Sequence, residues 1–262
     1  MLLSTRLSSY GTQVLAVAAV EVQKLRHDPW ELATRAIQPV LWLLLFGEVM
    51  AQVRGLNVGN LRYLDFLSAG VLAQSMMFVA IFYGISAIWE RDLGVLQRYL
   101  VSPAARSALV LGKALSACVR GLSQIVIVYL LAYSIGVSIN FAPIAIAGVV
   151  ALIVLGSGLF STLSLIIACI VKTRERFMGI GQVLTMPIFF ASNAIYPIDL
   201  MPDWLRLVAT GNPLTYEVDG LRELMLQDSS AVFGLPLDFA VLAAFFAVLV
   251  VIAARMYPRM AV

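Results

Sequence analysis

The sequence predicts an all-α integral membrane protein with six transmembrane helices in a single domain. Hydrophobic residues make up 61% of the 262 residues and charged residues only 13%, whereas a typical soluble domain carries about 25% charged residues. Long uncharged segments alternate with short charged ones, and about 20 apolar residues are enough to cross a bilayer. Since no polar block is large enough to fold as a separate soluble domain, we expect one membrane domain over residues 1–262.

The N-terminal region predicts a helix over residues 12–30 that lies on the membrane surface. Its apolar side chains share one helical face and its polar side chains share the other. These two sets are Leu15, Ala18, Val22 and Leu25 against Gln13, Glu21, Lys24 and Asp28. A signal peptide is the alternative, but the apolar core from Val14 to Val20 is only seven residues long and charged residues follow it directly. We therefore expect an interfacial helix.

Six apolar segments are expected to cross the membrane. The uncharged run from Gly121 to Val171 is 51 residues long, which is too long for one crossing, and Gly136, Asn140 and Pro143 mark the point where it turns back. In the fifth segment, a proline at position 187 predicts a kink. The predicted spans cover residues 36–53, 64–89, 109–135, 143–171, 177–195 and 235–255.

The basic residues predict how these spans are oriented. Fourteen of the 18 Lys and Arg residues fall on the side that holds both termini and the loop over residues 90–106. The other side has Arg54, Arg62, Arg206 and Arg222. Because cytoplasmic loops of membrane proteins are enriched in Lys and Arg, we expect a multi-pass cell-membrane protein with both termini in the cytoplasm.

The charged segment after the second span has the pattern of a surface helix from Glu90 to Ser102. One helical stripe is apolar and the opposite stripe is basic, with Leu93, Leu96 and Leu100 against Arg91 and Arg98. Pro103 should end the helix and turn the chain back toward the bilayer. A solvated loop that only sets the topology is the alternative. Glu90 is a candidate partner for Lys113 or Arg120, or a simple interfacial charge.

A set of residues in this segment carries a family resemblance. The set is Glu90-Arg91, Gly94, Leu96, Ser102-Pro103 with Arg106 three residues on, and Gly112-Lys113. It resembles the first cytoplasmic loop of ABC-2 type transporter permeases, most of all bacterial drug and lipid exporters similar to the daunorubicin-resistance type. In that family the loop is the coupling helix that docks on the ATPase, so residues 90–106 are named the coupling segment here. The resemblance implies an ATPase-coupling role for Glu90, Arg91, Leu93, Gly94, Leu96, Arg98, Leu100, Pro103 and Arg106.

The segment over residues 196–233 predicts two short helices on the outer side of the membrane. Pro202 and Pro213 should start them, and the first helix would turn Trp204, Leu205 and Val208 toward the lipid. The sequence NAIYPIDLMPDW followed by GNPLTYEVDGLREL resembles the second signature of ABC-2 permeases. In that family the corresponding helices are re-entrant and cap the transport pathway.

The resemblance also implies partners and a substrate pathway. The chain would pair with a second permease chain, identical or related, and with two ATPase subunits that use ATP and Mg²⁺, while binding no cofactor itself. The second and fifth spans line the central cavity in this family, which here implies a pathway of Gln74, Phe78, Phe82, Gln182, Met186, Phe189 and Asn193. Ordinary helix packing is the alternative for each of these residues. Such side chains suit export of a hydrophobic drug-like molecule or a lipid, with a lipid-linked glycan as the alternative.

Other classes of protein find little support in the sequence. There is no G-x-x-x-x-G-K-[ST] motif, so the chain should not hydrolyse ATP itself, and no catalytic or metal-binding motif of a membrane enzyme. Cys118 and Cys169 fall within predicted spans and give no disulfide framework. The dispersed basic residues do not indicate a nucleic-acid partner. A secondary transporter is the main competitor, with Glu48 and Arg120 as its deep charges, and a neighbouring ATPase gene would favour the exporter.

Overall fold

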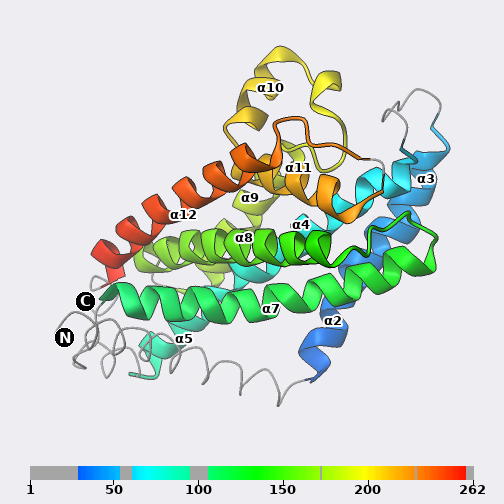
Figure 1. The fold of residues 1–262 in the computed structure, drawn as a ribbon. Helices are drawn as coiled ribbons and strands as arrows, with labels where there is room; N and C mark the ends of the chain where they lie inside the picture. Colours follow the sequence, from blue (N-terminus) through cyan, green and yellow to red (C-terminus); the bar gives the residue numbers. More distant parts are fainter. Residues whose placement is uncertain (1–28, 54–60, 95–105, 172, 228, 258–262) are drawn as a thin grey trace, which may run out of the picture.

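The computed structural model describes residues 29–53, 61–94, 106–171, 173–227 and 229–257, without the side chains of residues 29–33 and 106–108. The expected interfacial helix over residues 12–30 therefore lies almost wholly outside the described residues. Helices account for most of the described chain (Figure 1). They are α2 (Pro29–Val40), the π-helix η1 (Leu41–Gly47), α3 (Glu48–Ala51), α4 (Tyr63–Tyr83), α5 (Ile85–Asp92), α7 (Arg106–Ser134), α8 (Pro143–Ile170), α9 (Arg174–Phe190), the 3-10 helix η2 (Ile198–Leu200), α10 (Asp203–Thr210), α11 (Pro213–Met225) and α12 (Leu235–Met256).

Four helical segments of the described chain are long and apolar enough to cross a membrane. They are Tyr63–Asp92, formed by α4 and α5, Leu109–Ser134 within α7, Pro143–Ile170 and Leu235–Met256. These segments correspond to the second, third, fourth and sixth of the six expected spans. Among them, α8 ends one residue before the expected bound of 171, and α12 ends one residue after the expected bound of 255.

The first and fifth expected spans have different bounds from those expected. Residues 36–53 do not form one regular α-helix, because Pro39 lies inside α2 and removes a backbone donor, after which the chain passes through η1 into α3. The fifth helix, α9, begins at Arg174 and stops at Phe190 rather than covering 177–195. The helix ends there because Ala191 leaves the helical conformation, with φ −92° and ψ 34°.

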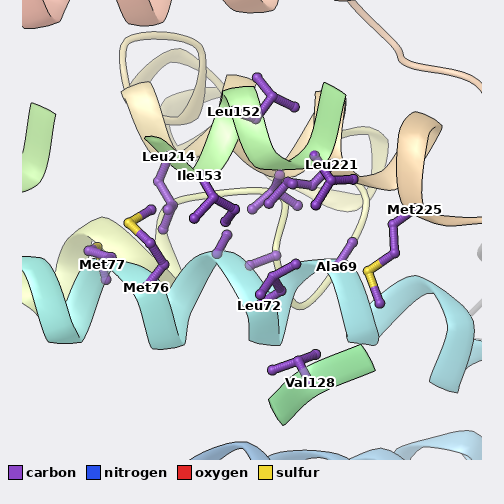
Figure 2. Packing of buried hydrophobic residues seen from close by; sticks show 14 of the residues in the cluster. Ala69, Leu72, Met76, Met77, Val128, Leu152, Ile153, Leu214, Leu221 and Met225 are labelled. Carbon is purple, nitrogen blue, oxygen red and sulfur yellow. The ribbon is translucent and has the colours of Figure 1, made fainter. Parts of the chain in front are cut away.

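Helix α4 forms the centre of the bundle, in contact with α7, α8, α9 and α11. Its side chains are buried around the whole helix, which is typical of a helix enclosed by other helices. Figure 2 shows Leu72 and Met76 of α4 close to Ile153 of α8 and Leu214 and Leu221 of α11. The outer helix α12 instead leaves apolar side chains exposed along its length. An exposed apolar face of this kind is expected on a helix that borders lipid.

Small residues let the central helices approach closely. A methyl group built on Gly121 of α7 would overlap the hydroxyl of Ser157 on α8, and one built on Gly70 of α4 would overlap the carbonyl of Ala194. Close backbone approach of this kind is a common way for membrane helices to pack, because lipid offers no hydrophobic drive for their association. The contact between α7 and α8, which run side by side in Figure 1, therefore depends on residue size at position 121.

The turn between α7 and α8 contacts the end of α11. Gly136 adopts a positive φ of 76°, which other residues rarely tolerate, and a short antiparallel bridge then joins Ile139 to Leu226. The backbone N–H of Asn140 donates to the carbonyl of Met225 at 2.8 Å. The predicted turn near Gly136 is therefore confirmed, and it fixes α11 against the bundle. This region is named the α11 end, and the opposite region, where α5 ends and α7 begins, is named the α5 end (Figure 1).

Two short helices occupy the segment before α12, as the proline signals predict. Helix α10 begins at Asp203 and α11 at Pro213, where the side chain of Asn212 accepts a hydrogen bond from the N–H of Leu214 at 3.0 Å. One detail of the sequence prediction is wrong. Trp204 is exposed, but Leu205 packs against the buried cluster that includes Met201.

Candidate functional site

A cluster of charged side chains lies at the α5 end, where the coupling segment begins. Nζ of Lys113 on α7 lies 2.6 Å from Oε2 of Glu90 on α5, and both side chains are buried, at 3% and 9% exposure. Lys113 is one of the two partners that the sequence left open for Glu90. This ion pair joins the start of the coupling segment to α7, and removing one partner of such a buried pair is costly because the other charge stays buried.

A second, half-exposed contact joins the same segment to α9. Nη2 of Arg174 donates to Oδ2 of Asp92 at 2.8 Å, and its guanidinium lies 3.5 Å from the centre of the Trp89 ring. Arg91 lies 3.1 Å from the other carboxylate oxygen of Asp92. A guanidinium can form an ion pair and stack on an aromatic ring at the same time. The end of α5 is therefore attached to both α7 and α9.

The predicted helix from Glu90 to Ser102 is wrong at its start. Helix α5 continues from α4 and ends at Asp92, and Gly94 follows with a positive φ of 70°. A left-handed residue cannot continue a right-handed helix, so α5 does not extend past Gly94, and Leu93 is 70% exposed. Leu96, Arg98, Leu100 and Pro103 lie outside the described residues, and Arg106 opens α7 without a described side chain.

A pocket of about 460 Å³ lies between α2, α4, α5 and α7. It contains two of the predicted pathway residues, Phe78 and Phe82, whose rings stack with centroids 5.4 Å apart. The complete lining is Thr34, Arg35, Gln38, Ser75, Phe78, Val79, Phe82, Tyr83, Ile85, Ser86, Arg120 and Gln124. Its volume falls within the range of small-molecule sites, and its lining combines polar side chains with aromatic and aliphatic ones.

Two of the polar lining residues, Arg120 and Gln124, come from α7. Arg120 is only 7% exposed, and its guanidinium lies 4.7 Å from the centre of the Tyr83 ring. Gln124, one turn further along α7, is fully buried, and neither its oxygen nor its nitrogen has a hydrogen-bond partner among the described residues. The pocket therefore combines a buried cation and an unsatisfied amide with two aromatic rings.

The other predicted pathway residues do not line this pocket. Gln74 is buried in the core of α4, while Gln182 and Met186 are exposed on α9. Phe189 is buried, with its ring 5.2 Å from that of Trp42. Asn193 is 1% exposed and lies near the α11 end. Phe78 and Phe82 of the second span therefore lie together in this pocket, while the other five predicted pathway residues do not join them there.

Sequence analysis missed most of the pocket lining, although a signal was present. The α4–α5 lining residues follow helical spacing from Ser75 to Ser86, and Arg120 and Gln124 are four residues apart on α7. Spacings of three and four place side chains on one face of a helix. What the sequence could not show is that these two faces, together with Arg35 of α2, meet each other rather than lipid.

The α11 end holds buried ionisable groups that the sequence did not single out as deep charges. Glu217 is fully buried against Gly156 of α8, and neither carboxylate oxygen has a partner among the described residues, so burial raises its pKa well above the ordinary range. Asp219 accepts a hydrogen bond from the N–H of Phe233 at 2.9 Å. Arg222 donates to the carbonyl of Asn193 at 2.8 Å. The hydrogen bonds of Asp219 and Arg222 therefore tie α11 to its neighbours.

The remaining candidates give no sign of a metal or redox site. Within the described residues, no group of three or more His, Cys, Asp or Glu side chains could hold a metal ion. Cys118 is buried and Cys169 partly buried, and both are free thiols. Glu48, the other candidate deep charge, is exposed on α3.

Comparison with known proteins identifies the family. The sequence profile of the ABC-2 type transporter family matches residues 12–226. The chain is 31% identical over 215 residues to the ycf38 transport permease of Pyropia yezoensis, covering 81% of this chain and 73% of that protein. It is 29% identical over 209 residues to the ycf38 transport permease of Cyanophora paradoxa, covering 79% and 71%. It is 22% identical over 204 residues to the daunorubicin resistance ABC transporter permease protein DrrB1 of Streptomyces coeruleorubidus, covering 76% and 70%. The chain therefore belongs to the ABC-2 type transporter family of membrane permeases.

Proposed function

We propose that this chain is the membrane subunit of an ATP-driven exporter that moves a hydrophobic drug-like molecule or a lipid outward across the cell membrane. Two separate ATPase subunits would use ATP and Mg²⁺, and a second permease chain, identical or related, would complete the pathway. Membership of the ABC-2 family supports this assembly, and a relative named as a daunorubicin resistance permease supports a drug-like substrate. A lipid-linked glycan is the alternative substrate.

The observation that carries the proposal is the position of the pocket relative to the α5 end. Phe78 and Phe82 form one wall of the pocket on α4, and the same wall continues into α5 at Ile85 and Ser86. Four residues later, α5 reaches the buried Glu90 that pairs with α7. An ATPase that pushed on the coupling segment would therefore act on a helix that itself lines the pocket.

We extend the proposal to six crossings with both termini in the cytoplasm. The helical path from Pro29 to Ala51 is about 34 Å long and α9 about 25 Å, from a rise of 1.5 Å per residue, so each is close to the thickness of the hydrocarbon core. Residues 196–233 would then form a re-entrant cap on the outer side. Single cysteines at Ser107 and Gln227, in a chain lacking Cys118 and Cys169, should react with an impermeant thiol reagent from opposite sides. Labelling of both from outside would contradict six crossings.

The function itself is tested by assembly and transport. The purified chain should co-purify with an ATPase subunit, and inside-out vesicles containing both should accumulate substrate only with ATP. Phe78→Ala should reduce the stimulation of ATPase activity by substrate, whereas Phe141→Ala, an exposed aromatic in the turn before α8, should leave it unchanged. Transport driven by an ion gradient, with no ATPase in the complex, would instead establish a secondary transporter.

A further inference from the structure

The carboxyl group of Glu217 on α11 is fully buried and lies apart from both the pocket and the α5 end. We propose that Glu217 is a proton-binding site. With the proton bound, the neutral carboxyl lets α11 pack against α8, and loss of the proton moves the middle of α11 away from Gly156 of α8. The inference goes beyond the proposed function, because it concerns this chain alone and involves neither ATPase nor substrate.

The carboxyl group lies in a space that a glycine provides. A methyl group built on Gly156 would overlap both carboxylate oxygens of Glu217. The same two helices meet again one turn away, where a methyl group built on Gly220 of α11 would lie 2.9 Å from the side chain of Leu152 of α8. Gly156 lies halfway along the 28 residues of α8, a helix long and apolar enough to cross a membrane. The carboxyl is therefore enclosed between two helices at a depth where water is scarce.

Within the described chain, no side chain balances a negative charge on Glu217. Neither carboxylate oxygen has a hydrogen-bond partner there, and α8 carries no charged residue. Arg222, the cation of α11, instead donates to the carbonyl of Asn193 and lies 3.7 Å from the centre of the Phe66 ring on α4. Asp238 of α12 approaches α11 one turn away from Glu217, where an ionised carboxylate would repel a second negative charge.

The other titratable or charged groups of the helices packed against α11 do not bond to Glu217 either. They are Tyr63, Asp65 and Tyr83 of α4, Cys169 of α8, Asp203 and Arg206 of α10, Arg255 of α12, and Tyr216, Asp219 and Glu223 of α11 itself.

An ionised carboxylate at this position is costly, so the packed arrangement of α11 and α8 requires the proton. A buried charge without a partner costs far more free energy than a buried neutral polar group. Water or a cation could lower that cost, but either one reaches the carboxylate of Glu217 only if the two helices separate at Gly156. Loss of the proton therefore favours their separation at this point.

Both ends of α11 limit how far the helix can move. At its start, the side-chain amide of Asn212 donates to the carbonyls of Ile188 and Ala191 at 2.7 and 2.8 Å. At its end, the carbonyl of Met225 accepts a hydrogen bond from the N–H of Asn140 at 2.8 Å. Loss of the proton should therefore loosen the middle of α11 without releasing the whole helix from the bundle.

Hydrogen–deuterium exchange on the purified full-length chain in a neutral maltoside detergent tests the inference. Exchange of the α11 backbone amides is followed by mass spectrometry from pH 6 to pH 8.5 and corrected for the intrinsic pH dependence of amide exchange. The corrected exchange rate in the middle of α11 should rise about tenfold or more over this range in the parent chain. In Glu217→Gln, whose side chain is uncharged at every pH, the rate should change by less than about twofold. A constant rate in the parent chain, or an equal rise in Glu217→Gln, would overturn the proposal.

Two other carboxyl groups near α11 serve as controls. The carboxylate of Glu223, on the same helix, accepts a hydrogen bond from the N–H of Ala231 at 2.8 Å, so Glu223→Gln should keep the pH response of the parent chain. Asp238→Asn should keep it as well. Loss of the response in either control, with the response retained in Glu217→Gln, would assign the proton to another group and refute the site. If Glu217→Gln does not fold, Glu217→Met, with an apolar side chain of similar length, takes its place.

Gly156→Ala tests the location of the carboxyl group. The added methyl group should displace the carboxyl of Glu217, so the exchange rate of α11 should be raised throughout the pH range. In a Glu217→Ala chain the same methyl group has room, and adding Gly156→Ala there should change the exchange rate by less than about twofold. An equal effect of Gly156→Ala in both chains would show that the carboxyl does not occupy this space and would overturn the proposal. No ATPase is present in these measurements, so their failure would leave the proposed exporter standing.

Discussion

Neutralising Glu90 should destabilise the chain, and neutralising Lys113 in addition should restore most of the loss. The two side chains are 9% and 3% exposed, with the charged atoms 2.6 Å apart. Removing one partner of a buried ion pair costs about 3–5 kcal/mol because the other charge remains buried, whereas removing both charges is often close to neutral. We therefore expect Glu90→Gln to cost about 3 kcal/mol, Lys113→Gln a similar amount, and the double variant about 1 kcal/mol or less.

Thermal unfolding in a neutral detergent, followed by intrinsic tryptophan fluorescence, measures these changes. For a chain of this length a change of 1 kcal/mol shifts the melting temperature by about 2–4 °C, so each single variant should melt about 6–12 °C below the parent chain. Glu175→Gln is the matched control, since Glu175 is exposed at the same end of the bundle and should change stability by less than about 0.5 kcal/mol.

The double-mutant cycle gives the result that would refute this reasoning. If the pair acts as a buried ion pair, the two single effects exceed the double effect by several kcal/mol. Additive effects, with the double variant the least stable of the three, would mean that Glu90 and Lys113 act independently. The proposed attachment of the coupling segment to α7 would then be wrong, regardless of how strongly these variants bind the ATPase.

Three further predictions concern other parts of the chain. Leu96→Ala should reduce co-purification of the ATPase more than Arg98→Ala. The reason is that truncating a buried apolar anchor at an interface costs about 2 kcal/mol or more, while a charge at the rim mainly affects the association rate. Equal yields of co-purified ATPase from the two variants would contradict docking by the leucines. Glu217 has a raised pKa, so the folded chain retains a proton that the unfolded chain releases. The free energy of unfolding should therefore fall as pH rises above the ordinary glutamate pKa, by up to about 1.4 kcal/mol per pH unit. Glu217→Gln should flatten that slope in melting curves taken from pH 5 to 8, and an unchanged slope would assign it to another group. Gly121→Ala should cost about 1–3 kcal/mol by overlap with Ser157, and Ser157→Ala should recover part of the loss. An unchanged free energy of unfolding in Gly121→Ala would show that the α7–α8 contact accommodates the added methyl group.

The sequence predicted those elements whose signals are local. Asn212-Pro213 starts α11 because asparagine caps the first N–H groups and proline lacks the donor that would otherwise be unsatisfied. Pro143 starts α8 for the same reason, and Gly136 supplies the positive φ of the turn before it. In each case the residue acts on backbone that lies within a few positions of it in the chain.

The parts that the sequence did not predict depend on which helical faces meet. Gln182 and Gln74 have the same side chain and both were expected in the pathway, yet one is exposed on α9 and the other is buried in α4. Along a membrane helix, lipid-facing and core-facing positions are both apolar, so periodicity does not separate them. Glu217 was missed as a buried charge for a related reason, since the space that holds it is created by Gly156 on a distant helix.

The break at Gly94 changes how force from an ATPase would reach the pocket. A continuous helix from Glu90 to Ser102 would have rotated as one body, whereas the observed left-handed residue separates the end of α5 from the rest of the coupling segment. Two ion pairs lie on the pocket side of the break, the Glu90 pair with Lys113 of α7 and the Asp92 pair with Arg174 of α9. The first is buried and costly to break, and the second is half-exposed and contributes about 1 kcal/mol or less. A push on the segment should therefore break the ion pair with α9 before the one with α7, because the weaker pair breaks first. The pocket is lined by α2, α4, α5 and α7 but not by α9, so its walls would stay in place while α9 moves.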